Sequence, residues 1–179
     1  MNYNPSTRNR IADIIMGLHV ETTGGVLVAA NFATGGVDTD LFNIYGRIAV
    51  KQLFIELTAA ADAEVTQVAF YTTFTTPVIG QNLIAAKCAS IASLGAYGRI
   101  VFVAGAVLTA AVITDSAGCS DVETAGKIHI LGGVSAAGVN TIGVIGMQSS
   151  DASQAATIAA TAHLFYVPMS AGAYATAAL

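Results

Sequence analysis

The three histidines are the residues of this 179-residue chain best suited to ligate a metal or move a proton. They are His19, His129 and His163, and each stands alone in an apolar run. No HExxH pair or other zinc-site spacing of histidines is present. Because strand alternation sets His129 ("KIHIL") and His163 ("TAHLF") opposite their apolar neighbours, we expect each on the outer face of a strand or at an interface.

The cysteines offer a thiol but no recognisable redox or metal motif. Cys88 and Cys119 are too few for a disulfide framework, and neither belongs to a CxxC pair. Cys88 lies in "AAKCASIA" and shares strand parity with Ile84 and Ala86. Since free cysteine is among the most buried residue types, we predict a buried, inert thiol at this position.

The acidic residues form two small groups. Asp38 and Asp40 in "GGVDTD" have spacing compatible with a cation site, but the EF-hand loop pattern is absent. Asp115, Asp121 and Glu123 share one loop that contains glycine and serine. We interpret both groups as solvated loop charges.

Sequence motifs for nucleotide or acyl chemistry are also absent. The chain has no GxxxxGK[ST], no GxSxG and no GxGxxG. Its net charge is −4 and its basic residues are scattered, so no stripe that could follow a phosphate backbone is readable. The sequence therefore predicts a protein that is not an enzyme, uses no cofactor or metal, and does not bind nucleic acid.

Composition indicates a protein with little free surface. Hydrophobic residues make up 54% of the chain, charged residues only 10%, and the mean hydropathy is +0.66. An ordinary soluble domain carries about 25% charged residues. A free monomer with this few charged residues would expose much apolar surface to water. Either a membrane or partner proteins must therefore cover much of that surface.

The membrane interpretation is not supported by the charge-free stretches 65–86, 128–150 and 152–179. Each is interrupted by Thr, Ser, Gln or Pro, whereas a spanning helix needs roughly 20 consecutive, predominantly apolar residues. The N-terminus has two arginines but no apolar run of the signal-peptide type directly behind them. We therefore expect a soluble, non-secreted protein whose surface is covered by partners.

The elements that must position these residues are mostly strands. Gly46 predicts a kink or bulge in the longest strand-like run, and 31–40 is predicted as a loop by its Gly, Asn and Asp content. Short strands with frequent turn signals favour an all-β fold, a single antiparallel β-sandwich or jelly-roll-like barrel. Strands are predicted at 24–30, 41–58, 64–76, 83–91, 99–104, 107–113, 127–131, 139–147 and 157–168.

The chain divides into an N-terminal segment and one β domain. Residues 1–24 are predicted to form an extended arm with one short helix, since 10–20 places apolar residues at helical spacing. Residues 25–179 are predicted to form a single β-sandwich domain. Arg8 and Arg10 in the arm "MNYNPSTRNR" are candidate contacts to a partner surface.

The run 48–57 is apolar on both strand parities. A strand with one solvent-exposed face should show polar residues on that face, so we expect this one to be covered on both sides. In a small sandwich the second cover could be another subunit, which predicts a homo-oligomer. The predicted interface consists of Ile48, Val50, Phe54, Phe165 and Tyr166.

Two stretches, "LFNIYGRIAVKQLFIELT" (41–58) and "HLFYVPMSAGAY" (163–174), resemble the capsid decoration, or cement, proteins of tailed bacteriophages. In that group an "LF" strand with a following glycine opens the main sheet, and a "YVP" segment with a Gly/Ala tail closes it. This chain has His-Leu-Phe where a Trp is common, and a longer N-terminal segment. The matching positions are Leu41, Phe42, Gly46, Leu53, Glu56 and Thr58, then Tyr166, Val167, Pro168, Ala171, Gly172 and Ala173.

The resemblance implies a structural virion protein on the outer surface of a capsid, assembled in the host cytoplasm. Such a protein bridges major capsid protein subunits, often as a trimer, so we expect a homotrimer with a dimer second. Pro168 cannot donate a hydrogen bond to a ladder, so it should end the last long strand. Residues 169–179 are then expected to make contacts instead of fraying.

Other classes share this composition. A phage tail or baseplate protein, or a receptor-binding or lectin-like β-module, is the main alternative, and an enzyme of unrecognised type is the least favoured. A sugar site would need an exposed cluster of Trp, Tyr, Asp and Asn. The chain contains no Trp, which counts against a sugar site.

Overall fold

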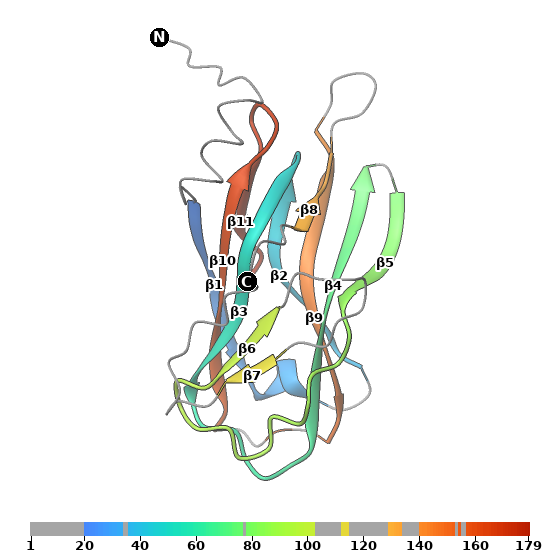
Figure 1. Cartoon of the computed structure of the whole chain (residues 1–179). Helices are drawn as coiled ribbons and strands as arrows, with labels where there is room; N and C mark the ends of the chain where they lie inside the picture. Colours follow the sequence, from blue (N-terminus) through green and yellow to red (C-terminus); the bar gives the residue numbers. More distant parts are fainter. Residues whose placement is uncertain are drawn as a thin grey trace.

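The computed structural model describes residues 20–33, 36–76, 78–102, 112–114, 129–133, 140–152, 154 and 157–179. In these ranges two antiparallel sheets pack face to face as a sandwich (Figure 1). The all-β prediction is confirmed, and of its two variants the open sandwich, not a closed barrel, is the one found. The predicted arm and helix, up to residue 19, lie outside the described residues.

The first sheet, sheet A, has the strand order β1-β10-β3-β6-β7, with β8 paired to β3 as well. All of its pairings are antiparallel. Its strands are β1 (Val20–Val28), β3 (Ile48–Ala59), β6 (Arg99–Phe102), β7 (Val112–Thr114), β8 (His129–Leu131) and β10 (Ala159–Pro168).

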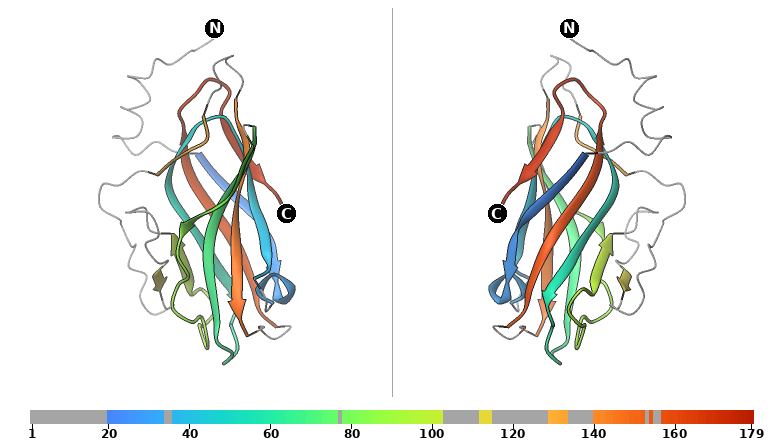
Figure 2. Two further views of the ribbon diagram at one scale, coloured as in Figure 1. Left: turned by 90° about the vertical axis from the view of Figure 1, so that its right-hand side faces the viewer. Right: turned by 90° about the vertical axis from the view of Figure 1, so that its left-hand side faces the viewer.

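The second sheet, sheet B, has the order β11-β2-β9-β4-β5. A short 3-10 helix, η1 (Ala29–Phe32), follows β1, and no helix in the described ranges is long and apolar enough to span a bilayer. The side views in Figure 2 show the two layers inclined to each other. The strands of sheet B are β2 (Asp38–Tyr45), β4 (Thr66–Thr76), β5 (Val78–Ala85), β9 (Ile142–Asp151) and β11 (Tyr174–Ala177).

The core lies between the sheets and is built from alternate residues of their strands. β10 shows the pattern plainly, because Ala160, Ala162 and Leu164 are buried while the residues between them are half-buried. Burying each large apolar side chain contributes about 1.5–3 kcal/mol, which drives the sheets together. The largest side chains of this core include Leu27, Phe32, Phe42, Ile44, Leu53, Ile55, Phe70 and Ile100.

Gly46 carries the chain from sheet B to sheet A. Its φ of +77° lies in the left-handed region that favours glycine. A Cβ at this position would also lie 2.7 Å from Ser170 Oγ and 2.9 Å from Asn140 Oδ1. The predicted single strand 41–58 is therefore wrong, since this turn divides it into β2 and β3, which belong to different sheets.

Other element boundaries also differ from the prediction. β1 begins at Val20, before the predicted strand at 24–30 and before the predicted domain start at 25. β2 begins at Asp38, so Asp38 and Asp40 belong to a strand and not to a loop. β10 ends at Pro168 as predicted, but β11 after it was not foreseen.

Candidate functional site

The outer face of sheet A brings together residues from β1, β3, β6 and β10. Paired residues in antiparallel strands project to the same face of the sheet. Phe54 pairs with His163, and Glu56 pairs with both Thr161 and Arg99. We call Phe54, Glu56, Arg99, His163 and Phe165 the outer cluster.

Phe54 is the centre of the outer cluster. Its ring stacks on the His163 ring, with centroids 4.8 Å apart and planes inclined by 17°, and it lies 6.1 Å from the Phe165 ring. The Cζ atom of Arg99 lies 5.0 Å from the Phe54 centroid, within range of a cation–π contact. These contacts fix the ring positions on the outer face and bury Phe54 itself, which is only 7% exposed.

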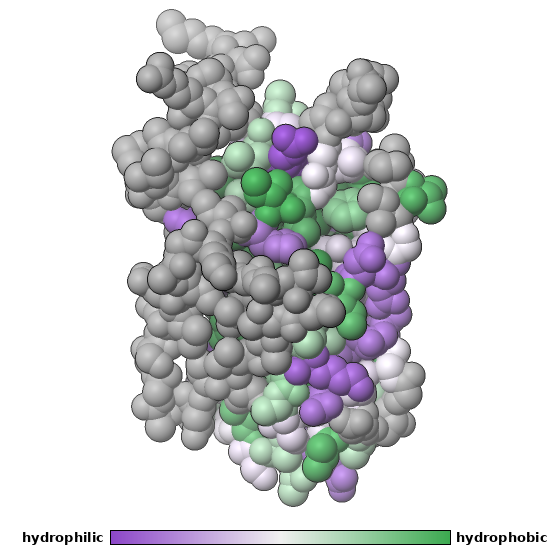
Figure 3. Space-filling view, turned by 45° about the vertical axis from the view of Figure 1, so that its right-hand side comes forward, coloured by the Kyte–Doolittle hydropathy of each residue, from purple (hydrophilic) through white to green (hydrophobic). Residues whose placement is uncertain are grey.

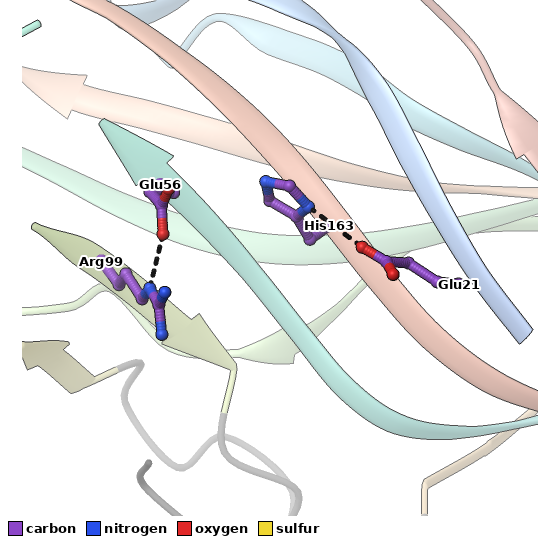
Figure 4. Close-up of polar contacts among 4 residues, drawn as sticks. All are labelled: Glu21, Glu56, Arg99 and His163. Atoms are coloured by element: carbon purple, nitrogen blue, oxygen red, sulfur yellow. Dashed lines mark hydrogen bonds and ion pairs between the residues drawn. The ribbon is translucent and has the colours of Figure 1, made fainter. Parts of the chain in front are cut away.

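Two ionic contacts flank the outer cluster (Figure 4). Arg99 Nε lies 2.6 Å from Glu56 Oε2, and His163 Nδ1 lies 3.7 Å from Glu21 Oε1. All four side chains are partly exposed, so each pair contributes little to stability. The His163–Glu21 contact is ionic only when the imidazole is protonated. The pairs mainly orient Arg99 and His163 against Phe54.

Exposed apolar residues surround the outer cluster. Val26 and Val28 of β1 project from the same face, because their partners Thr161 and Ala159 alternate with the buried residues of β10. Ile130 of β8 pairs with Ala49 on this face. Val26 is 66% exposed, and Val28 and Ile130 are each at least half exposed. An aromatic and arginine centre with an apolar surround is typical of a protein-binding surface.

The predicted interface divides between this face and the core. Phe54 and Phe165 lie on the outer face, but Ile48, Val50 and Tyr166 belong to the core cluster, so their prediction as interface residues is wrong. A register shift between β3 and β10 at Phe165/Tyr166 inserts an extra residue and reverses the strand parity. Tyr166 spans the sandwich instead, and its hydroxyl accepts a hydrogen bond from the Ala175 N–H at 3.0 Å.

The two described histidines differ. His163 lies on an outer face, as predicted. His129 does not, because its partner Val50 faces the core and its ring makes an edge contact with Phe102, with centroids 5.5 Å apart. Burial lowers the pKa of His129, which favours the neutral imidazole.

Cys88 is buried, as predicted. The Val68 N–H donates to its Sγ at 3.2 Å, and burial raises the thiol pKa. Burial is the larger effect, since the hydrogen bond from Val68 alone would lower the pKa, and a buried thiol with a raised pKa is typical of structural cysteines. Several predicted site residues lie outside the described residues, namely Arg8, Arg10, His19, Asp115, Cys119, Asp121 and Glu123.

The sequence pointed to Phe54, Phe165 and His163 but gave no prediction for Glu56 and Arg99 of the outer cluster. Glu56 shares strand parity with Phe54, and this spacing could have placed it on the same face. Arg99 carries no such signal, because its position beside Glu56 depends on the register between β3 and β6. Across the described side chains, no three His, Cys, Asp or Glu residues gather as a metal site would require.

The geometry defines the class of this protein as a two-sheet antiparallel β-sandwich. Compared with known proteins, the chain matches no family model, no curated protein and no solved structure. The resemblance to capsid decoration proteins therefore rests on the two stretches 41–58 and 163–174.

Proposed function

We propose that this protein is a structural virion component that decorates the outer surface of a tailed-phage capsid and stabilises it by bridging major capsid protein subunits. The observation that carries the proposal is the outer face of sheet A, where the outer cluster is surrounded by exposed Val26, Val28 and Ile130. The resemblance of 41–58 and 163–174 to cement proteins suggests which partner this face would bind, namely the major capsid protein.

The physical requirements of a cement protein agree with this chain. A protein that bridges subunits needs a rigid scaffold and adhesive surfaces, and it needs no catalytic group. The core between the sheets supplies the scaffold, and the low charge of the chain reduces the desolvation cost of covering its faces. We further propose that the protein acts as a homotrimer, with the outer face of sheet A buried between copies.

A receptor-binding or tail β-module is the second candidate. It is favoured by the exposed Tyr174, whose ring stacks on the half-buried Tyr45 of the opposite sheet from the outer cluster, because exposed aromatic rings are common anchors in binding surfaces. The two candidates differ in where the protein lies in the particle.

Shell binding tests the proposal directly. Expanded shells would be assembled from the major capsid protein encoded in the same genome, mixed with the purified protein, sedimented and imaged by electron microscopy. We expect ordered decoration at fixed lattice positions and shells that withstand a higher temperature. A protein that stays in the supernatant, or that is found only on the tail of the native particle, would contradict capsid decoration.

A further inference from the structure

The outer face of sheet B carries a hollow that the proposed function does not use. Asp38 and Asp40 project outward from β2, since their partners on β9 are Gln148 and Gly146 and the residues between face the core. The hollow beside them has a volume of about 740 Å³. Its lining combines apolar residues, among them Val37, Val144, Ala178 and Leu179, with the polar residues Asn31, Asp38, Asp40, Tyr71, Thr73 and Gln81.

Both carboxylates are held in place by neighbours. The Tyr71 hydroxyl donates to Asp40 Oδ1 at 2.7 Å, and Gln148 Nε2 donates to Asp38 Oδ1 at 2.9 Å. Burial, with Asp40 beside it, raises the pKa of Tyr71, so this hydroxyl keeps its proton and remains a donor. A carboxylate has about four acceptor positions, so each retains acceptor capacity towards a ligand.

The same strand leads from the acids to an aromatic surface. A register shift between Asp40 and Phe42 reverses the strand parity of β2. The residues that follow on the outer face are therefore Asn43 and Tyr45. The Tyr45 ring stacks on that of Tyr174, with centroids 4.5 Å apart, and Tyr174 is 46% exposed. At about 3.3 Å per residue, Asp40 and Tyr45 are separated by roughly 16 Å.

The rest of sheet B is mixed, because exposed polar side chains lie beside the exposed apolar residues Val78, Leu83 and Ile142. Hydrophilic residues gather on the side of β4 and β5 in the space-filling view (Figure 3). Gln81 and Asn82 of β5 are exposed, and Thr73 of β4 is half-buried. Hydroxyl and amide groups supply donors as well as acceptors, whereas the carboxylates supply acceptors alone.

We propose that this surface binds a neutral oligosaccharide along β2. A sugar hydroxyl both donates and accepts, so it suits a lining that mixes carboxylates, amides and hydroxyls. The C–H face of a sugar ring packs on the electron-rich face of an aromatic ring, and Tyr174 offers such a face. The span from Asp40 to Tyr45 requires several linked sugar units. We call Asp38, Asp40, Asn43, Tyr45 and Tyr174 the β2 track.

Other ligand classes fit the β2 track less well. An anionic ligand would meet two carboxylates and be repelled. A bound cation would need acceptors alone, and the described residues offer no group of three metal-ligating side chains. An arginine-rich peptide would pair with the acids but would leave the amide donors without a role.

Glycan binding goes beyond capsid decoration and uses the opposite sheet, so either can fail without the other. The test begins with an array of neutral and acidic oligosaccharides, and isothermal titration then measures affinity for the neutral hit. Asp40→Asn keeps an acceptor for Tyr71 but removes the charge, and Tyr174→Ala removes the exposed ring. Glu64→Gln and Tyr97→Ala make the same kinds of change at exposed positions away from the β2 track.

We expect the wild-type protein to bind at least one neutral oligosaccharide, and each β2-track variant to bind it about tenfold more weakly, as loss of one good polar or aromatic contact implies. The two control variants should bind like the wild type, and thermal melting should confirm that all four are folded. The proposal is overturned if no neutral oligosaccharide on the array binds, or if the protein binds acidic glycans or an oligo-arginine probe peptide selectively. It is also overturned if the control variants lose as much affinity as the β2-track variants, or if both β2-track variants bind like the wild type.

Discussion

The ring of Tyr71 occupies the space that a side chain at Gly146 would need. The two residues are paired across β4 and β9, and a Cβ placed on Gly146 would lie 2.2 Å from Tyr71 Cζ. Tyr71 is only 3% exposed although it projects from the outer face of sheet B. The missing side chain at Gly146 therefore allows Tyr71 to lie across β9 and reach Asp40 on β2.

Gly146→Ala should destabilise the protein by about 1–3 kcal/mol, because the added methyl group displaces a buried, hydrogen-bonded ring. Urea denaturation followed by circular dichroism would measure the free energy of unfolding. Gly80→Ala is the matched control, since a Cβ on Gly80 would meet nothing within 4 Å and should be neutral or stabilising. Equal stability of the Gly146→Ala variant and the wild type would show that the Tyr71 ring can move freely.

Tyr71→Phe should cost about 1–2 kcal/mol at neutral pH through loss of the hydrogen bond to Asp40. The folded state raises the Tyr71 pKa above its ordinary value of 10.0, so this contribution is fully present below pH 10.0 and is lost as the pH rises further. Denaturation from about pH 9 to about pH 11 should show the wild type losing its advantage over the variant. A constant difference across that range would mean that Tyr71 does not titrate with unfolding.

Cys88 should resist thiol reagents in the folded protein, because its side chain is buried and its pKa is raised. In a Cys119→Ser background Cys88 is the only thiol, so labelling by a chromogenic disulfide reports on it alone. We expect labelling to be more than about tenfold slower in buffer than in denaturant. Equally fast labelling in both solutions would place the thiol at the surface.

Val26→Asp should dissociate the proposed trimer. Val26 is already exposed in one chain, so the change spares the fold but would bury an unpaired charge in an interface on sheet A. Val78→Asp is the matched control, since Val78 is 88% exposed on sheet B. Sedimentation should show a trimer for the wild type and for Val78→Asp. A wild-type monomer at micromolar concentration would exclude the proposed oligomer.

Removal of residues 1–10 should weaken attachment to capsid shells while leaving the β-sandwich folded. Arg8 and Arg10 are two of only seven basic residues in an acidic chain, and we expect them to pair with acidic groups of a neighbour. Binding by the full chain should weaken as salt is added, because exposed ion pairs are screened. Unchanged shell affinity and salt dependence in the shortened protein would leave the two arginines without a binding role.

Much of the fold was readable from strand alternation. The predicted strand 64–76 overlaps β4, whose alternate residues Val68 and Phe70 lie in the core. Gly46 was recognised as a break, but a break in a strand and a crossing between sheets carry the same signal in sequence. β11 escaped prediction because its four residues, "YATA", are too short for a periodic pattern.

The outer cluster was only half predictable. Phe54 was named because the run 48–57 is apolar on both strand parities, and Phe165 lies in the stretch 163–174 that carries the resemblance. Ile48 and Val50 were misplaced because the register shift between β3 and β10 reverses parity, and a bulge depends on the partner strand. Glu21 and His163 are distant in sequence, so their contact follows only from the pairing of β1 with β10.

The position of β9 and β10 within the sheets has a consequence for biosynthesis. β10 lies between β1 and β3, and β9 lies between β2 and β4, so the strands made early have as their neighbours strands made late. On the ribosome β1 and β2 must therefore wait without a strand partner until residues 142–168 emerge, whereas β3 can pair earlier with β6 and β8. Such long-range pairing folds slowly. The nascent chain meanwhile exposes apolar strands with open edges, which makes it a substrate for chaperones and prone to aggregate.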